Sequence, residues 1–244
     1  MFTVVFFLFV CAEYRAKENE SMRFRRRLSS AVLIAASALV FSAGFPTVAY
    51  AQIGVAAPGM TIHTGTRICA LGATGYIGGA EYGVTAAHCY EEGKTVYSAG
   101  GRVIGHYEQA FGSDASIADM GFALIRLSPD TIMQAFLPGK IRINTADSAP
   151  YVGEEVCHIG TGTGHTCGHI TSVGNGHFIA DFPSEKGDSG GIVYHRAADN
   201  RVDFLGILIG SIEGSGALIE SAQYLRDSIN SHAGGSEPFQ WYTE

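Results

Sequence analysis

The sequence predicts an all-β protein made of two strand-rich halves and one C-terminal helix. From Gly59 onward, short apolar stretches rich in Val, Ile, Tyr and Phe alternate with glycine-rich turns, a spacing typical of β-sandwiches and β-barrels. Long amphipathic helical patterns are missing from this body of the sequence. The strand-like stretches are TRICALGATGYIGG, YGVTAAHC, KTVYSAGGRVIGHYEQ and MGFALIRL in the first half, and EEVCHIG, GHTCGHITSVGNGHFIADF, GGIVYHR and RVDFLGILIGSI in the second.

A loose boundary separates the halves near residues 127–150, where proline and polar residues interrupt the strand pattern. We therefore expect a first β domain over residues 52–135 and a second over residues 136–244. The segment LIESAQYLRDSINSH, residues 218–232, places apolar side chains at helical spacing, and Gly234-Gly235 follows it. This pattern predicts the terminal helix and its end.

The first 51 residues differ in character from the rest of the chain. Within them, MRFRRRLSSAVLIAASALVFSAGFPTVAYAQ combines a basic start, an apolar run and the triplet Ala49-Tyr50-Ala51, which is typical of a secretory signal peptide. The apolar run is shorter than the roughly 20 residues that a spanning helix needs. We expect cleavage after Ala51, a secreted extracellular product and no membrane association afterwards. We interpret residues 1–21 as an upstream extension from a start codon placed before Met22, and an unusually long leader is the alternative.

The charge balance excludes two classes of partner. Residues 1–51 contain six of the 16 basic and three of the 23 acidic residues, so their removal leaves ten basic against twenty acidic side chains. An acidic exported domain offers no electrostatic footprint for nucleic acid or anionic lipid. We expect neither of these partners, and we expect a monomer.

Four cysteines remain after the leader: Cys69, Cys89, Cys157 and Cys167. In an exported domain they permit three disulfide pairings. The sequential pairing, Cys69 with Cys89 and Cys157 with Cys167, keeps each bond within one half of the chain, and it is the one that we expect. A zinc site is the alternative, but the spacings match no paired CxxC pattern.

Histidines near the second cysteine pair raise the same question of metal binding. On a strand, His165, Cys167 and His169 would share one face. A disulfide at Cys167 removes its thiolate, so we expect no metal, and we interpret His158, His165, His169 and His177 as ordinary hairpin residues. No cofactor is expected.

Three segments carry the residues of a nucleophilic site. VTAAHC contains His88, ADMGFALIRL contains Asp119, and EKGDSGGIVY contains Ser189. A serine hydroxyl is a poor nucleophile at neutral pH and needs a base such as histidine, which a buried carboxylate then orients. Asp119 stands directly before an apolar strand, whereas its competitor Asp114 lies in a Gly/Ser turn. We therefore expect a triad of His88, Asp119 and Ser189.

TAAHC, an aspartate opening an apolar strand, and GDSGG, in that order, resemble the chymotrypsin-like serine peptidases. EVCHIGTGTGHTCGHI, residues 155–170, further resembles the disulfide-closed hairpin of small secreted bacterial members, the streptogrisins and α-lytic protease. The resemblance spans about residues 69–215. It implies two six-stranded antiparallel Greek-key β-barrels with a C-terminal helix.

The resemblance also implies roles for residues around Ser189. The backbone N–H groups of Gly187 and Ser189 would form the oxyanion hole, for which the turn needs glycine, and Asp188 would hold the loop. The strand FLGILIGSIEGSG would line the substrate pocket, with Ile209, Gly210 and Ser211 as wall residues. Pro183, six residues before Ser189, offers no carboxylate for a Lys or Arg side chain.

These observations predict a secreted serine endopeptidase that hydrolyses peptide or protein substrates through an acyl-enzyme. A catalytically silent binding module of the same fold and an esterase with the same triad are the alternatives. The preferred residue at the cleavage site, the physiological substrate and the mode of activation are not determined by the sequence.

Overall fold

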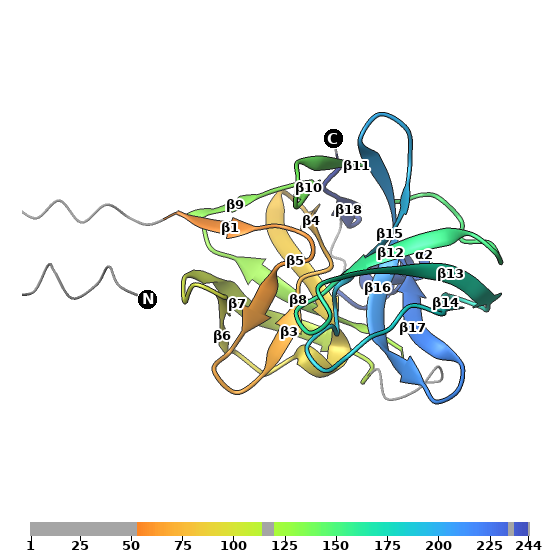
Figure 1. The fold of residues 1–244 in the computed structure, drawn as a ribbon. Helices are drawn as coiled ribbons and strands as arrows, with labels where there is room; N and C mark the ends of the chain where they lie inside the picture. Colours follow the sequence, from red (N-terminus) through yellow and green to blue (C-terminus); the bar gives the residue numbers. More distant parts are fainter. Residues whose placement is uncertain (1–52, 114–119, 234–236, 244) are drawn as a thin grey trace, which may run out of the picture. The chain divides into compact units, whose positions relative to one another are not determined.

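The computed structural model describes residues 53–113, 120–233 and 237–243. The leader and its predicted cleavage site therefore lie outside the described residues. Two eight-stranded sheets and one two-stranded sheet hold nearly all the regular structure, and α2 (Ala222–His232) is the one α-helix of the described part (Figure 1). The predicted all-β class with a C-terminal helix is confirmed.

The first large sheet contains the strands of the first half and curls into a barrel. Its strands, in the order of their hydrogen bonding, are β18 (Gln240–Trp241), β4 (Ala73–Ile77), β5 (Ala80–Ala86), β8 (Phe122–Leu127), β7 (Val103–Phe111), β6 (Thr95–Ser98), β2 (Thr61–His63) and β3 (Ile68–Ala70). β3 lies at one end of this order and β4 is next to the other end, although only Leu71 and Gly72 separate them in the chain. The short segment between β3 and β4 therefore brings the two sides of the sheet together.

The second large sheet closes directly through hydrogen bonds. β16 (Arg201–Ile212), β15 (Ile192–Arg196), β12 (Glu155–Ile159), β13 (His165–Val173), β14 (His177–Ala180) and β17 (Gly216–Ser221) pair in this order, and β17 pairs again with β16. Every one of these pairings is antiparallel. The result is a closed six-stranded barrel, to which β10 (Phe136–Leu137) and β11 (Ile141–Thr145) add at the outer side of β16.

Apolar side chains fill both barrels because the strands alternate between an inward and an outward face. In β14, for example, Phe178 and Ala180 are fully buried while the residues between them are half-buried. One core cluster contains Val84, Leu124 and Ile125 of the first barrel, and another contains Val193 and Leu205 of the second. This burial fixes the register, since a one-residue shift would turn each strand inside out.

The terminal elements connect the two halves. β1 (Gly54–Ala56) pairs in parallel with β9 (Thr131–Met133), directly before the strands of the second barrel begin. β18 pairs with β4, so the last described strand adds to the first sheet, although its sequence number falls within the range predicted for the second domain.

The helix begins later than the sequence pattern predicts. Residues 218–221 belong to β17, where they pair with β14 and β16, and only then does the chain become helical. The hydroxyl of Ser221 accepts a hydrogen bond from the Tyr224 N–H and caps the helix. The apolar periodicity therefore extends across a strand end and a helix start. The predicted glycine stop lies outside the described residues.

Candidate active site

His88 lies in a short turn that continues a buried strand of the first barrel. β5 ends at Ala86, and the 3-10 helix η1 (Ala87–Cys89) follows at once. A disulfide joins Cys89 to Cys69 on β3. The guanidinium of Arg67, which lies in the turn between β2 and β3, donates a hydrogen bond to the His88 carbonyl oxygen. His88, which is half-buried, therefore lies in a turn that follows β5 directly and that the Cys69–Cys89 disulfide joins to β3.

A second clamp fixes the chain just beyond this turn. The Glu91 carboxylate accepts hydrogen bonds from the Thr66 hydroxyl at 2.7 and 2.9 Å and from the Thr64 hydroxyl. The Thr64 bond, followed by the Thr66 bond, lowers the pKa of Glu91 below its usual 4.5. The tip of the β2–β3 hairpin therefore holds the segment that follows His88.

Ser189 lies in a tight loop directly before β15 of the second barrel. Gly187 has φ of +99° and Gly190 has φ of +82°, both in the region that favours glycine. Ser189 is half-buried, whereas Asp188 is fully buried. The loop thus turns one aspartate inward and leaves the serine beside it within reach of solvent.

The Asp188 carboxylate anchors this loop through four hydrogen bonds from neighbouring groups. Its Oδ1 accepts from the N–H groups of Gly162 at 2.7 Å and Thr163 at 3.0 Å. Its Oδ2 accepts from the Thr163 hydroxyl at 2.8 Å and from the Glu185 N–H at 2.8 Å. Burial alone raises the pKa of Asp188, but these donors outweigh burial and keep the pKa below the usual 3.8. The carboxylate is therefore ionised and tied to the β12–β13 hairpin.

The structure brings the Ser189 loop against the His88 turn. The Ala70 N–H donates to the Ser189 carbonyl oxygen at 2.8 Å, and Cys89 Sγ lies 3.9 Å from the same oxygen. A Cβ on Gly190 would lie 2.0 Å from Thr85 Oγ1, so the loop touches the end of β5. Two segments that are about a hundred residues apart in the sequence thus meet where the barrels join.

A threonine of the β12–β13 hairpin strengthens this junction. The Thr161 hydroxyl lies 3.1 Å from the Cys69 carbonyl oxygen, to which it donates, and 3.1 Å from the Thr61 hydroxyl. The next two residues of the hairpin bind Asp188. The same hairpin therefore contacts the disulfide of the His88 turn and the anchor of the Ser189 loop. Sequence reasoning missed this role, because a Gly/Thr-rich turn carries no signal of its long-range partners.

The backbone at Ser189 has the properties expected of an anion-binding site. Within the part of the chain that the structure describes, no residue accepts a hydrogen bond from the Gly187 N–H or the Ser189 N–H. Backbone N–H groups near the surface of a protein are normally paired with protein or water. Both donors are therefore available to a ligand oxygen.

The predicted orienting carboxylate belongs to the segment directly before β8. Asp119 and its competitor Asp114 both lie outside the described residues. The strand that follows, β8, pairs with β5, and its first residue Phe122 lies opposite Ala86. The assignment of Asp119 stays a prediction.

One hollow is lined by two of the four residues predicted for the substrate pocket. Pro183 and Ser211 line it, as predicted, whereas Ile209 is 2% exposed and packs in the core. Gly210, the residue between, pairs with Leu218 and is not among the lining residues. The complete lining is Asp181, Phe182, Pro183, Ser184, Ser211, Ile212, Gly214, Ser215, Gly216 and Ala217.

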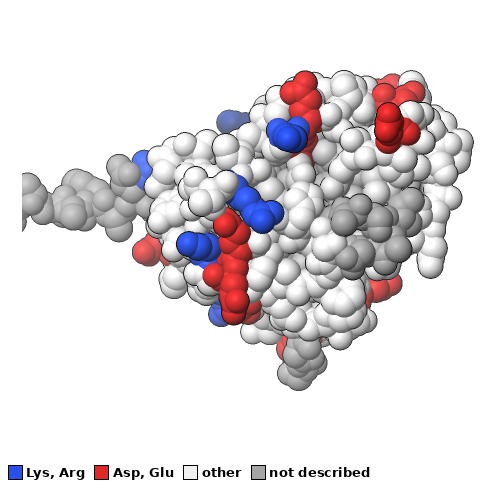
Figure 2. Space-filling model, turned by 90° about the horizontal axis from the view of Figure 1, so that it is seen from below, with Lys and Arg blue, Asp and Glu red and all other residues white. Residues whose placement is uncertain are grey.

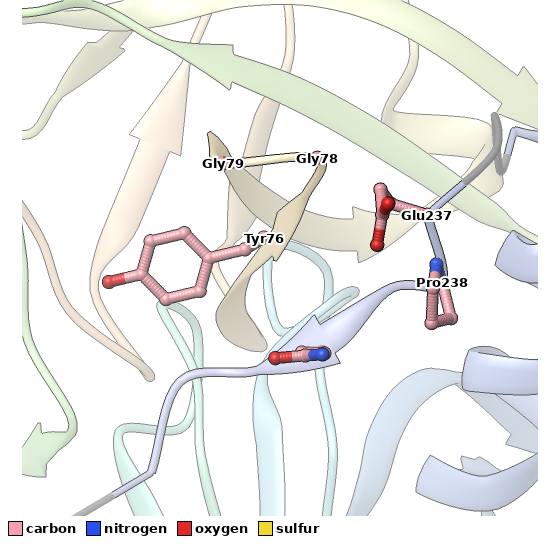
Figure 3. Close-up of a pocket in the computed structure, with 6 residues that line it drawn as sticks. Tyr76, Gly78, Gly79, Glu237 and Pro238 are labelled. Atoms are coloured by element: carbon pink, nitrogen blue, oxygen red, sulfur yellow. The ribbon is translucent and has the colours of Figure 1, made fainter.

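A second hollow contains none of the predicted site residues. Figure 3 shows a hollow between the Gly78-Gly79 turn and the chain that leads into β18, with the Glu237 side chain on one side and the Tyr76 ring on the other. The face of the molecule in Figure 2 is mostly uncharged, and its acidic and basic side chains form small adjoining groups.

Both disulfides join the cysteines that the sequential pairing predicts. Cys157 and Cys167 face each other on β12 and β13. His165 Nε2 lies 3.7 Å from Cys167 Sγ and 2.9 Å from the Tyr194 hydroxyl. Because the sulfur is part of a disulfide, it offers no thiolate to a metal.

The fold is that of the chymotrypsin-like serine proteases of bacteria. Thermobifida fusca Protease A superposes with a TM-score of 0.59 at 18% identity, covering 78% of this chain and 100% of that chain. Nocardiopsis Protease (NAPase) superposes with a TM-score of 0.59 at 20% identity, and the match covers 78% of this chain and 100% of that chain. A glutamic acid specific serine protease superposes with a TM-score of 0.57 at 22% identity, and the match covers 77% of this chain and 100% of that chain. These superpositions show a shared fold with two barrels.

The sequence itself has a nearer relative. The chain belongs to the family of a Mycobacterium tuberculosis protein described as "Uncharacterized protein MT1863", to which it is 36% identical over 173 residues, or 66% of this chain and 76% of the relative. A protein of a second strain, "Uncharacterized protein Rv1815", is 36% identical over 174 residues. No family model matches the chain.

No helix in the described part of the chain has both the length and the apolar character needed to cross a lipid bilayer.

Proposed function

We propose that this protein is a secreted serine endopeptidase. In the proposed mechanism the Ser189 hydroxyl attacks the carbonyl carbon of a peptide bond while His88 takes the proton of that hydroxyl. His88 then donates that proton to the leaving amine, and water, deprotonated by His88, releases the acyl group from Ser189. Asp119 is the proposed carboxylate that orients the His88 ring.

One observation carries the proposal: the loop with Ser189 is docked by its own carbonyl oxygen on the strand and disulfide that hold the His88 turn. An ordinary surface turn would not require a left-handed Gly187, a buried carboxylate and two available N–H groups beside a serine. These N–H groups are suited to the negative charge that develops on the attacked carbonyl oxygen. Removal of one such donor typically costs on the order of 10² to 10³ in rate.

Substrate selection is proposed to occur in the hollow that Pro183 and Ser211 line. The neighbouring end of β16 would pair with the extended backbone of the substrate, as in other strand-addition modes of binding. Asp181 lines this hollow, but its Oδ1 accepts a hydrogen bond from the His169 N–H at 2.6 Å. One oxygen of this carboxylate is therefore engaged with β13.

The proposed secretion draws support from the two disulfides of the barrels, because such bonds persist in oxidising compartments. Residues 1–51 would then act as the export signal and be removed. Mass spectrometry of the secreted product tests this: the proposal requires an N-terminus close to residue 52.

A fluorophosphonate probe tests the chemistry of the proposed function. The purified chain is incubated with the probe beside Ser189→Ala and His88→Ala, and a peptide library is then digested. Labelling of the wild type alone, together with peptide cleavage, supports the peptidase. A folded wild-type chain without labelling indicates a binding module instead, and ester turnover without peptide cleavage indicates an esterase.

The orienting carboxylate has its own matched pair of variants. Asp119→Asn should keep the fold and lower kcat by about 10⁴, because the imidazole then lacks the partner that fixes its tautomer. Asp114→Asn should retain normal turnover. Normal kcat in Asp119→Asn would exclude Asp119 from the triad.

A further inference from the structure

His158, on β12, is buried directly behind the Ser189 loop. Its side chain is 0% exposed, and its two ring nitrogens face different groups. Nδ1 lies 3.2 Å from the Ile192 carbonyl oxygen, whereas Nε2 lies 3.9 Å from Asp188 Oδ1 and has no hydrogen-bond partner among the described residues. A carbonyl oxygen can only accept, so in the neutral ring the proton is on Nδ1. The lone pair of Nε2 therefore faces the carboxylate.

The surrounding backbone is shaped to hold this ring. A Cβ on Gly160 would lie 2.5 Å from His158 Nε2, and a Cβ on Gly191 would lie 2.5 Å from its Cε1. Both glycines thus leave the space that the imidazole occupies. A ring in this position prevents the Asp188 carboxylate from turning away from its donors.

The His158 ring stacks on an aromatic side chain. The rings of His158 and Phe182 are nearly parallel, with an interplanar angle of 2° and a centroid distance of 5.5 Å. Phe182 also lines the hollow that we propose as the substrate pocket. A single buried histidine therefore contacts both the anchor of the Ser189 loop and a wall of the pocket.

The charge state of the ring follows from its surroundings. Burial lowers the pKa of His158 below its usual 6.5, while Asp188 and the Ile192 carbonyl act in the opposite direction. Asp188 from the loop and His165 from β13 are the titratable groups that face the ring, and His165 lowers the pKa further. The ring is neutral at neutral pH and gains a proton only under more acidic conditions.

We propose that His158 is a positioning residue, which holds Asp188 on its backbone donors and thereby keeps the N–H groups of Gly187 and Ser189 aligned beside the pocket wall formed by Phe182. This inference rests on the proposed function for its effect on catalysis, but the alignment itself does not depend on activity. His158 does not touch the reacting atoms. Its influence passes through Asp188.

Kinetic constants of His158 variants test the catalytic part. In His158→Ala the space behind Asp188 is empty, so we expect kcat for a peptide ester to fall at least tenfold with a smaller change in KM. His158→Gln should recover most of kcat, because its side chain again fills the space behind Asp188. His177→Ala is the matched control and should retain wild-type values, because among the described residues the His177 ring on β14 bonds only to the Asn175 carbonyl oxygen of its own turn.

Amide hydrogen exchange tests the positioning part without any substrate. The N–H groups of Gly162, Thr163 and Glu185 donate to Asp188, so their exchange should become at least tenfold faster in His158→Ala and stay unchanged in His177→Ala. A wild-type chain that neither reacts with the probe nor turns over substrate would refute the proposed function, and exchange would still decide the role of His158. Unchanged exchange together with unchanged kcat in His158→Ala would overturn the inference.

A pH titration of the wild type covers the case in which His158→Ala does not fold. Protonation adds an N–H at Nε2 that competes with Gly162 and Thr163 for Asp188 Oδ1. Their amide resonances should therefore shift with the midpoint of the His158 ring, below pH 6.5, while the Glu185 amide, which donates to Oδ2, should shift less. Amides that do not follow the His158 midpoint would also overturn the inference.

Discussion

The two barrels hold their parts of the candidate site in different ways. The His88 turn is fixed by elements close to it in the sequence: the strand that directly precedes it, and a disulfide to a cysteine 20 residues away. The Ser189 loop is fixed by a buried carboxylate whose donors at Gly162 and Thr163 come from another hairpin, 26 and 25 residues away. One half relies on a covalent bond, and the other on a network of hydrogen bonds.

This difference predicts how each half should fail. A disulfide restricts the conformations of the unfolded chain, and it does not titrate in the acidic range. A buried carboxylate anchors a loop only while it is ionised and its hydrogen-bond donors are in place. The disulfide of the first half should therefore tolerate acid, and only the half-buried Glu91 clamp beside it should weaken at low pH. The second half should be sensitive both to acid and to single substitutions.

The largest effect is expected from Asp188→Ala, which breaks the network of the second barrel. Four donors would lose their acceptor in a buried site, so the free energy of unfolding should fall by about 3 to 5 kcal/mol. Urea denaturation measures this change. Asp227→Ala, an exposed aspartate on α2, should change stability by less than about 0.5 kcal/mol.

The same carboxylate predicts a pH dependence. Because the folded pKa of Asp188 lies below the usual 3.8, the unfolded chain binds the proton more readily in the range between the two values. Its contribution to stability is complete above this range and is lost as the pH falls through the folded pKa. Asp188→Asn should therefore show a smaller loss of stability between pH 5 and pH 3 than the wild type, and an equal loss would contradict this assignment.

Removal of the first disulfide should have the next largest effect. Cys69→Ala with Cys89→Ala releases a loop of 20 residues, which corresponds to about 3 kcal/mol in the chain-entropy model. Catalytic turnover should fall as well, because this bond holds the His88 turn. The matched pair Cys157→Ala with Cys167→Ala closes a shorter loop of 10 residues between paired strands, and it should reduce stability with a smaller loss of turnover. Equal losses of turnover in both pairs would remove the proposed distinction between the halves.

Gly190→Ala tests the contact between the halves. The new methyl would lie 2.0 Å from Thr85 Oγ1 and 2.4 Å from the Ala70 carbonyl oxygen, and φ is +82°. We expect a loss of about 2 kcal/mol in stability and a marked fall in kcat/KM. Gly164→Ala separates the two causes, because its φ of +71° is similar and nothing lies within 4 Å of the added Cβ. A similar loss of kcat/KM in both variants would show that backbone strain, not the contact, is responsible.

The smallest effect is expected from Thr161→Val, which removes one hydroxyl with little change of shape. The variant loses the hydrogen bond to the Cys69 carbonyl oxygen, so stability should fall by about 1 kcal/mol. Thr171→Val is the control. The exposed Thr171 hydroxyl donates to the Ile179 carbonyl oxygen at 3.3 Å within the second barrel. Turnover should decrease only in Thr161→Val, since of these two threonines only Thr161 bonds to a residue of the other half.

Much of the site was accessible from the sequence because its signals are local. The glycines around Ser189 predict a turn with unusual backbone angles, and Gly187 and Gly190 have them. The spacing of the cysteines within each half predicts the two disulfides. Ile209, in contrast, was expected in the pocket wall but is buried in the core, because alternation along β16 does not tell which face meets the hollow.

His158 shows where local signals end. As part of a histidine-rich hairpin it gave no indication of a special environment, yet it is fully buried between Asp188 and Phe182. The glycines that make room for it, Gly160 and Gly191, lie on different segments, and each looks like an ordinary turn residue by itself. No pattern within one segment can encode such a three-way contact.

The sequence by itself determined the strand-rich architecture, the order of His88, Asp119 and Ser189, and the backbone shape around the serine. Alternation, glycine placement and residue chemistry are properties of short segments, so these features need no distant information. Only the tertiary structure decided which donors surround Asp188, which ring fills the space behind it, and which strand receives the Ser189 loop. Barrel closure sets these contacts, because the register of many strands together brings remote segments to the same junction.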